Sequence, residues 1–171
     1  MIIFETERFI VRSYNFDVDK EDFFRIHGDA EVMRYIRPPK SREESDKFLK
    51  ENIEFTLQNP GRGRVAVTEK ESGKTAGSFA LIPVEGTQDW QLGYVLLKEY
   101  WGKGVATELT REGLKYFFST CDLEIIYGVT EEGNLASQKV LLKNGFKISG
   151  HKMDGQIRLI IFQVRRADLP D

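Results

Sequence analysis

The spacing of apolar residues changes along the chain and separates expected helices from expected strands. Residues 4–14 mix apolar, charged and β-branched residues, which predicts a first strand. Behind it, Phe23 and Ile26 follow helical spacing, and Asp17 could cap a helix that breaks near Gly28. The chain is therefore expected to open with a strand followed by a helix.

A second helix carries a clear start signal. Ser41 and Glu44 match a capping box, in which each side chain accepts a hydrogen bond from the other residue's backbone N–H. The preceding Arg37-Pro38-Pro39 disfavours helix, and Asn59-Pro60-Gly61 favours its end. The sequence thus predicts a helix between Ser41 and about Asn59.

Beyond this helix the apolar period is mainly that of strands. Expected strands cover residues 64–68, 75–84, 90–97, 124–129, 146–153 and 156–165, and expected helices cover about 103–118 and 134–143. Hairpin-length turns join the middle strands, so that part of the sheet should be antiparallel. The helix over 103–118 is long enough to cross over and leave the next strand parallel. We therefore expect one α/β (α+β) domain over residues 1–171, with a mixed, mostly antiparallel, twisted sheet flanked by helices.

Composition and charge narrow the expected functions. The 171 residues suit one domain, and the formal net charge of -2 is less basic than expected of a general nucleic-acid binder. The single cysteine, Cys121, excludes an intramolecular disulfide, and two distant histidines, His27 and His151, make a metal site unexpected. Charge follows soon after Met1, which disfavours a signal peptide, and no apolar run approaches the roughly 20 residues of a membrane helix. We expect a cytoplasmic protein without metal, nucleic acid or membrane as partner.

The main chemical signal lies at the start of the helix expected over 103–118. Gly102-Lys103-Gly104 stands directly before Val105-Ala106-Thr107. A helix start exposes backbone N–H groups without internal partners and carries partial positive charge, so it attracts anions. The glycines allow unusual backbone angles and close approach, and Lys103 adds a positive charge. The spacing matches neither of the two common nucleotide motifs, but it favours a site for a diphosphate.

Segments before and after this turn carry a family resemblance. They are Thr6-Glu7-Arg8-Phe9-Ile10-Val11-Arg12, Gly93-Tyr94-Val95-Leu96-Leu97, Trp101-Gly102-Lys103-Gly104-Val105-Ala106-Thr107-Glu108, and the helix that begins Asn134-Leu135-Ala136-Ser137 and ends at Gly145-Phe146. Together they resemble the GNAT superfamily of acetyltransferases, in particular the branch that contains the ribosomal-protein N-terminal alanine acetyltransferases. The resemblance covers nearly the whole chain. It implies a GNAT-like domain with a splayed pair of parallel strands, and an acetyl-CoA-dependent N-acetyltransferase.

The resemblance also assigns residues to acetyl-CoA. It implies that the backbone amides of residues 102–107 hold the diphosphate of coenzyme A. It places Val95 and Leu97 against the pantetheine arm, where a backbone N–H should polarise the thioester carbonyl. Asn134 matches a residue that contacts this arm or an ordered water, and it can also cap its helix. The remaining candidates are two side chains, one helical turn apart, that could face the cofactor's phosphates or only solvent: Lys139 and Lys143.

The expected reaction is direct attack of a primary amine on the acetyl thioester. Some family members protonate the leaving thiol with a tyrosine, but Leu141 matches that position. Ser137 therefore remains the catalytic candidate, either as the acid or as a small residue that leaves room for the arm. Related chains often place a glutamate base at the position of Gln91, and glutamine cannot accept a proton at neutral pH. Glu108 suits the helix dipole and is expected to be structural, whereas an acid in the 85–89 turn could act through water.

A site without a strong base favours an amine of low pKa. An α-amino group titrates near 7.7–8.0 and a lysine near 10.4, so we expect a protein or peptide N-terminus as the acceptor. Two alternatives stay open: an acetyltransferase for a small-molecule amine (antibiotic, polyamine or metabolite), and a sensor that binds acetyl-CoA without turning it over. The family layout places the acceptor against residues 35–39, Phe79, Trp90 and the last hairpin, and makes a homodimer the expectation for assembly.

Overall fold

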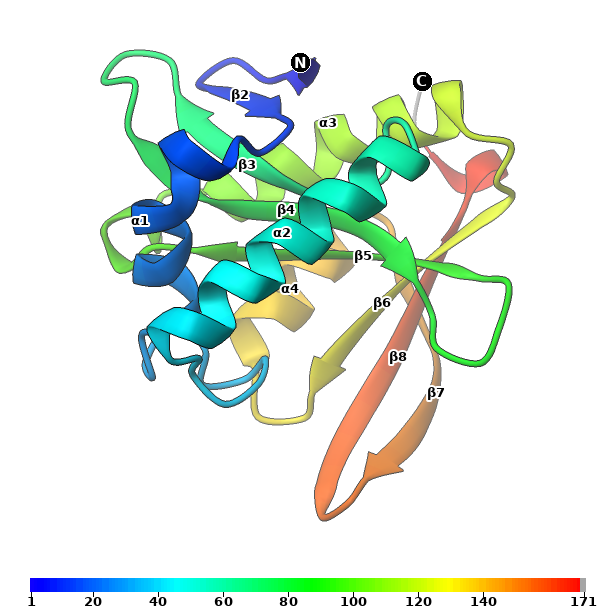
Figure 1. Cartoon of the computed structure of the whole chain (residues 1–171). Coiled ribbons are helices and arrows are strands. Elements are labelled where there is room, and N and C mark those ends of the chain that lie inside the picture. Colours follow the sequence, from blue (N-terminus) through cyan, green and yellow to red (C-terminus); the bar gives the residue numbers. More distant parts are fainter. Residues whose placement is uncertain (170–171) are drawn as a thin grey trace.

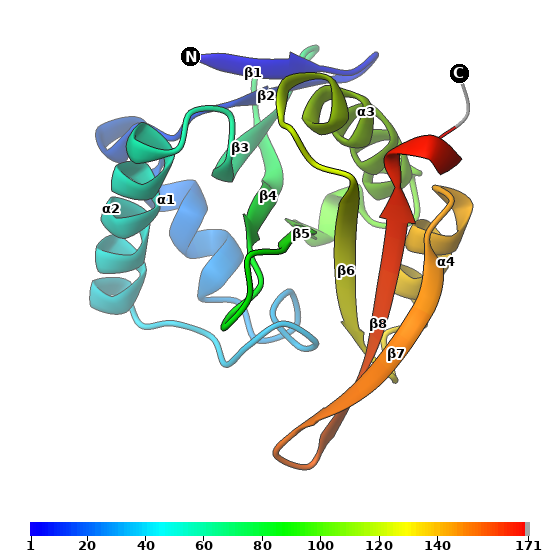
Figure 2. The ribbon, with the colours of Figure 1, turned by 90° about the vertical axis from the view of Figure 1, so that its right-hand side faces the viewer.

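The computed structural model describes residues 1–169, which form an eight-stranded sheet with helices on both faces (Figures 1 and 2). The strands are β1 Ile2–Glu5, β2 Phe9–Arg12, β3 Gly63–Glu69, β4 Thr75–Pro83, β5 Trp90–Leu96, β6 Ile125–Glu131, β7 Lys147–Asp154 and β8 Ile157–Arg165. The helices are α1 Phe16–His27, α2 Arg42–Gln58, α3 Val105–Thr120 and α4 Leu135–Lys143, with short 3-10 helices at Lys98–Tyr100 and Arg166–Asp168. None of the described helices is long and apolar enough to cross a membrane.

The sheet is mixed, as the sequence predicted. Its strands lie in the order β1-β2-β3-β4-β5-β6-β8-β7, so the chain returns by a hairpin to insert β8 beside β6. Neighbouring strands are antiparallel except β5 and β6, which are parallel and connected through α3. This confirms the expected mixed, mostly antiparallel sheet with one parallel pair. The pair is parallel because α3 carries the chain back along the sheet before β6 begins.

The first segment differs from the prediction of a single strand over residues 4–14. The structure divides it into β1 and β2, which pair antiparallel. Thr6 makes the turn between them, because its backbone N–H donates to Phe9 O at 2.9 Å and its hydroxyl accepts from Phe9 N at 2.9 Å. The predicted cap is also wrong, since α1 is capped by Asn15, whose side chain accepts from the N–H groups of Asp17 and Val18.

The capping box at the start of α2 is confirmed. Glu44 N donates to the Ser41 hydroxyl at 3.2 Å, and Ser41 N donates to the Glu44 carboxylate at 2.7 Å. These bonds satisfy two backbone N–H groups that a helix start would leave without partners. The helix ends at Gln58, directly before the Asn59-Pro60-Gly61 segment that the sequence marked as its end.

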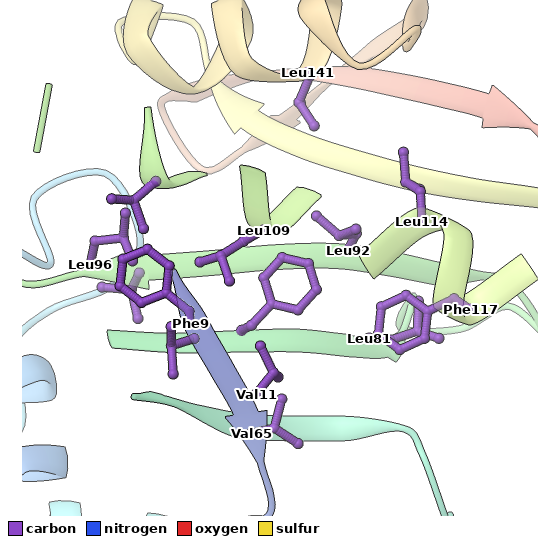
Figure 3. Packing of buried hydrophobic residues seen from close by; sticks show 14 of the residues in the cluster. Phe9, Val11, Val65, Leu81, Leu92, Leu96, Leu109, Leu114, Phe117 and Leu141 are labelled. Atoms are coloured by element: carbon purple, nitrogen blue, oxygen red, sulfur yellow. The ribbon is translucent and has the colours of Figure 1, made fainter. Parts of the chain in front are cut away.

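The two helical layers differ in what they bury. Helices α1 and α2 lie on one side of the sheet, and α3 and α4 lie on the other (Figure 2). Leu109 and Phe117 of α3 pack onto the sheet with Phe9, Leu81 and Leu92, forming the main core (Figure 3). Burial of these large apolar side chains holds α3 in place, at roughly 1.5–3 kcal/mol for each fully buried side chain.

The layer between the sheet and the pair α1–α2 is smaller and contains unpaired polar groups. Tyr14, Phe23, Leu49 and Ala66 form its apolar cluster. His27 lies against it, with its ring centroid 4.1 Å from that of Phe23 and an exposed fraction of 1%. Neither ring nitrogen of His27 has a hydrogen-bond partner among residues 1–169.

This environment keeps His27 neutral. Burial, together with the positive charges of Arg64, Arg37 and Lys40, lowers the pKa of His27 to about 3. In the unfolded chain the same imidazole titrates near 6.5. Below pH 6.5 the unfolded chain therefore binds a proton that the folded protein does not, and the stability that His27 contributes above this pH is lost progressively towards pH 3.

We expect His27 to lower the free energy of unfolding by about 2 kcal/mol between pH 7 and pH 5. Urea unfolding at both pH values measures this loss. The His27→Leu variant should show a correspondingly flatter pH dependence, because it lacks the titrating group. The exposed His151 offers the matched control, and His151→Gln should retain the wild-type dependence. An unchanged slope in His27→Leu would contradict the assignment.

Candidate active site

β5 and β6 diverge along their length. They are parallel, and their pairing register contains one residue pair, Gln91 with Tyr127. On its other side β5 stays paired with β4 from Trp90 to Leu96. The edge of β5 beyond Gln91 therefore carries backbone groups that β6 does not satisfy, and a ligand with an extended polar chain could pair with them.

The ladder with β4 decides which backbone groups face this divergence. The N–H of Leu97 donates to Ala76 O at 2.9 Å, so it faces β4. In an antiparallel pair the facing groups alternate, which also turns the N–H of Val95 towards β4 and those of Tyr94 and Leu96 towards β6. Val95 and Leu97, at which the sequence predicted backbone contacts, thus direct their N–H groups to β4, and the N–H groups at the open edge belong to Tyr94 and Leu96. The sequence marked the strand but could not fix its hydrogen-bonding phase.

The glycine turn follows directly after β5 and the short 3-10 helix. Gly102 and Gly104 have φ values of 70° and 73°, which glycine adopts without strain, and Gly104 is the N-cap of α3. No backbone N–H from Gly102 to Thr107 donates to an acceptor among the described residues. These donors converge at the positive end of the α3 dipole, an arrangement that suits a diphosphate.

Two contacts fix the position of this turn. Arg8, in the β1–β2 turn, donates from its backbone N–H and its Nε to the Glu108 carboxylate at 3.0 and 2.6 Å. Trp101 Nε1 donates to Leu96 O at 2.8 Å and ties the turn to the end of β5. The Arg8 guanidinium also lies beside the turn, since its Nη2 would be 3.9 Å from a Cβ built at Gly104.

Glu108 is structural, as the sequence indicated. Burial raises its pKa, but hydrogen bonds from Thr6 and Arg8 outweigh burial and lower the pKa overall. The carboxylate is therefore ionised at neutral pH and fully engaged. It connects the N-terminal hairpin to the first turn of α3, where a negative charge is also favoured by the helix dipole.

A side-chain pair lies across the divergence, between β5 and α4. The Tyr94 hydroxyl is 3.3 Å from the Ser137 hydroxyl, and burial raises the pKa of Tyr94. Asn134 caps α4, since its side-chain oxygen accepts from Ser137 N at 3.2 Å. Leu141 is buried against β6, where a Cβ built at Gly128 would be 3.0 Å from it. Tyr94 was not singled out as a chemical group by its sequence, because only the fold brings it to Ser137.

The predicted basic side chains are accessible. Lys103 in the turn and Lys139 and Lys143 on α4 are exposed, and none forms an ion pair within residues 1–169. Helix α4 packs beside α3, so its side chains share one side of the sheet with the glycine turn (Figure 2). These three charges are therefore available to an anionic ligand. The same exposure is also expected of lysines that contact only solvent.

The expected acceptor residues divide into two groups. Phe79 is fully buried and stacks on Phe117 in the main core, so its predicted place in the acceptor site is wrong. Trp90 is partly buried, with the Arg62 guanidinium 4.5 Å from its ring centroid. Tyr35 lies against the loop before α4, since a Cβ built at Gly133 would be 3.4 Å from its ring.

No carboxylate takes the place of the missing glutamate at Gln91 within β5. The Gln91 amide donates weakly to Pro83 O at 3.5 Å. Glu85 and Asp89 lie exposed in the β4–β5 turn. The site therefore offers polarising N–H groups and hydroxyl groups, but no buried carboxylate among the described residues of β5.

Comparison with protein families decides the class of this site. The acetyltransferase (GNAT) domain family matches residues 8–147. The chain belongs to the GNAT family of acetyltransferases. It is therefore an acetyl-CoA-dependent acetyltransferase, and the matched range includes the glycine turn, the divergent strand pair and the start of α4.

Individual relatives agree on the class and differ in the acceptor. The uncharacterized N-acetyltransferase YoaA of Bacillus subtilis is 27% identical over 151 residues, covering 86% of this chain and 84% of the relative. The ribosomal-protein-S5-alanine acetyltransferase of Vibrio fischeri has a TM-score of 0.79 at 21% identity, covering 98% of both chains. The spermidine N-acetyltransferase of Vibrio cholerae, solved with CoA and spermine, has a TM-score of 0.76 at 19% identity, covering 94% of this chain and 96% of the other.

We expect Gly104→Asp to weaken coenzyme A binding at least about 10-fold, measured by calorimetric titration. The substitution puts a side chain where φ is 73° and a negative charge at a helix start that should hold a diphosphate. Gly73→Asp is the matched control. Gly73 also has a positive φ of 69°, but it lies in the β3–β4 turn, and this variant should bind normally. Equal affinity in two folded variants would refute the placement of the diphosphate.

Proposed function

We propose that this enzyme transfers an acetyl group from acetyl-CoA to the α-amine of a peptide or protein N-terminus. The observation that carries the proposal is the alignment of unpaired donors. The N-terminal turn of α3 and the free edge of β5 are adjacent, and Trp101 joins them through its bond to Leu96. A diphosphate at the turn would leave an extended arm running along β5.

The residues fit coenzyme A at three points. The backbone N–H groups of residues 102–107 would bind the diphosphate, with Lys103, Lys139 and Lys143 supplying positive charge nearby. The edge of β5 would pair with the amide groups of the pantetheine arm. Asn134 would contact the pantetheine arm or an ordered water from the start of α4, where its side chain already caps the helix.

Polarisation of the reacting carbonyl would come from the β5 backbone. The N–H groups of Tyr94 and Leu96 face the divergence and are held by the ladder on the opposite side of the strand. A fixed donor aimed at developing negative charge lowers the barrier because it needs no reorganisation during the reaction. The Tyr94–Ser137 hydroxyl pair would deliver a proton to the departing thiolate.

The absence of a carboxylate at Gln91 favours the α-amine. With a pKa of 7.7–8.0, about a third of α-amines are neutral at pH 7.5, whereas only about a thousandth of lysine side chains are. Glu108 cannot serve as a base, because it is bound to Arg8 beside the turn. An acceptor that arrives largely neutral needs less help from the protein.

An acceptor screen tests the function. Release of free thiol from acetyl-CoA would be followed with peptides, with the same peptides blocked at the N-terminus, and with spermidine, and mass mapping would locate the acetyl group. The proposal expects transfer to free peptide N-termini. Faster transfer to spermidine or lysine would favour a small-molecule acceptor. Tight coenzyme A binding without any transfer would favour a sensor.

We expect Ser137→Ala and Tyr94→Phe each to lower kcat about 10-fold with little change in KM for acetyl-CoA. The effect should be modest because a thiol with pKa near 8.5 leaves moderately well without an acid. The double variant should cost about as much as either single variant, because the two hydroxyl groups act as one unit. Steady-state kinetics at several pH values measures this.

Ser119→Ala provides the control for loss of a helical serine. Ser119 lies at the end of α3, and its hydroxyl bonds only Tyr116 O among the described residues. Wild-type kcat is expected for this variant. Full activity in Ser137→Ala would instead show that Ser137 only leaves room for the arm.

A further inference from the structure

Two arginines without acidic partners lie in the layer between the sheet and α1–α2. Arg64 is on β3 and Arg37 is in the segment before α2. Their guanidinium groups lie 5.4 and 5.1 Å from the ring centroid of Phe48. Neither guanidinium forms an ion pair or hydrogen bond within residues 1–169.

The local field around these arginines is positive. Burial, together with the charge of Arg37, lowers the pKa of Arg64 to about 10. Burial also lowers the pKa of Arg37. Most other arginines of the chain are matched to acids, as Arg12 is to Asp19 at 2.7 Å. Two partly buried cations that repel each other destabilise the fold unless an anion joins them.

Unpaired polar groups line the same layer. His27 is 1% exposed and lies within the field of both arginines, and Ser78 on β4 is 1% exposed. The His27 nitrogens have no partner among the described residues, and the Tyr14 and Ser78 hydroxyls face each other without a well-formed hydrogen bond. Since buried polar groups are nearly always hydrogen-bonded, this layer holds more donor capacity than the fold itself uses.

The sheet connects this layer to the reacting edge of β5. Arg64 pairs with Ala80 of β4, and Ala80 pairs with Gly93 of β5, so the three residues share one face. Two strand spacings put the Cα atoms of Arg64 and Gly93 about 10 Å apart. A Cβ built at Gly93 would meet no atom within 4 Å, so there is open space beside Gly93, where β5 and β6 diverge.

We infer that Arg64 and Arg37 bind a carboxylate of the acceptor, so that the enzyme prefers a peptide N-terminus with an acidic residue beside the reacting amine. The inference rests on the proposed function, because it places the acceptor on the α1–α2 face of Gly93. Among the described residues of β3, β4 and β5, Arg64 is the charged residue on this stretch of the face. A polycation such as spermidine would be repelled there.

The chemistry matches the residue type. Arginine donates in a planar fork that fits a carboxylate, and its charge persists at any physiological pH. The open space beside Gly93 leaves room for an acceptor on this face of the strand, next to the thioester. The same carboxylate chemistry could come from an acidic side chain or from the α-carboxylate of a free amino acid.

The test compares acceptors that differ in the charge beside the reacting amine. Peptides beginning Ala-Asp, Ala-Asn and Ala-Lys, together with free alanine and alaninamide, would be assayed for kcat/KM and for equilibrium binding in the presence of coenzyme A. We expect the Ala-Asp peptide to exceed the Ala-Asn peptide by about 10- to 100-fold. A larger preference for free alanine over alaninamide would assign the site to amino acids.

Variants separate binding of the carboxylate from folding. Arg64→Gln and Arg37→Gln should abolish the preference for Asp over Asn, and Arg64→Lys should restore part of it. Arg34→Gln removes an exposed charge from the same segment and should leave the preference unchanged. Thermal unfolding checks that each variant is folded.

The outcomes distinguish this inference from the proposed function. Equal kcat/KM for Asp and Asn peptides in a protein that acetylates both would overturn the carboxylate site and leave the transferase assignment intact. Without turnover, the binding measurement still decides, because preferential binding of the Ala-Asp peptide that is lost in Arg64→Gln supports the site. Equal binding of both peptides refutes it.

Discussion

β5 and β6 are held together at one residue pair, Gln91 with Tyr127, and then separate. The chemistry of the molecule depends on this separation, because a continuous ladder would satisfy every backbone group that now faces outwards. The crossover from β5 to the parallel β6 runs through α3, which follows β5 after the 3-10 helix Lys98–Tyr100 and the glycine turn. The topology that opens the strand edge therefore also places a helix start beside it.

The position of α3 is set by the core rather than by the site. Leu109 and Phe117 fix the helix on the sheet (Figure 3). Glu108 binds the N-terminal hairpin through Arg8. Because the core holds α3 firmly on the sheet, the backbone N–H groups of its first turn, which begins after Gly104, stay in place without partners. A mobile helix start would bind its ligand less tightly, because each binding event would have to order the helix start and lose its conformational entropy.

Local signals explain which parts of the structure could be predicted from sequence. Ser41 and Glu44 specify the start of α2 within a few residues, and glycines mark the turn before α3. The β1–β2 turn was missed because Thr6 closes it without glycine or proline. The phase of β5 was also missed, because it depends on the bond from Leu97 to Ala76, which lies on another strand.

The rest of the site could not be read from the sequence because the alternation of β5 divides it between two faces. Tyr94 turns towards α4 and meets Ser137, whereas Gly93 turns towards the layer that contains Arg64. Under the proposed function, successive residues of one strand would serve the donor on one face and the acceptor on the other. Where β5 separates from β6, the sheet no longer divides its two faces. An amine bound beside Gly93 could therefore reach a thioester bound along the same strand. The same separation of β5 from β6 that frees the strand edge would then also bring the two substrates together.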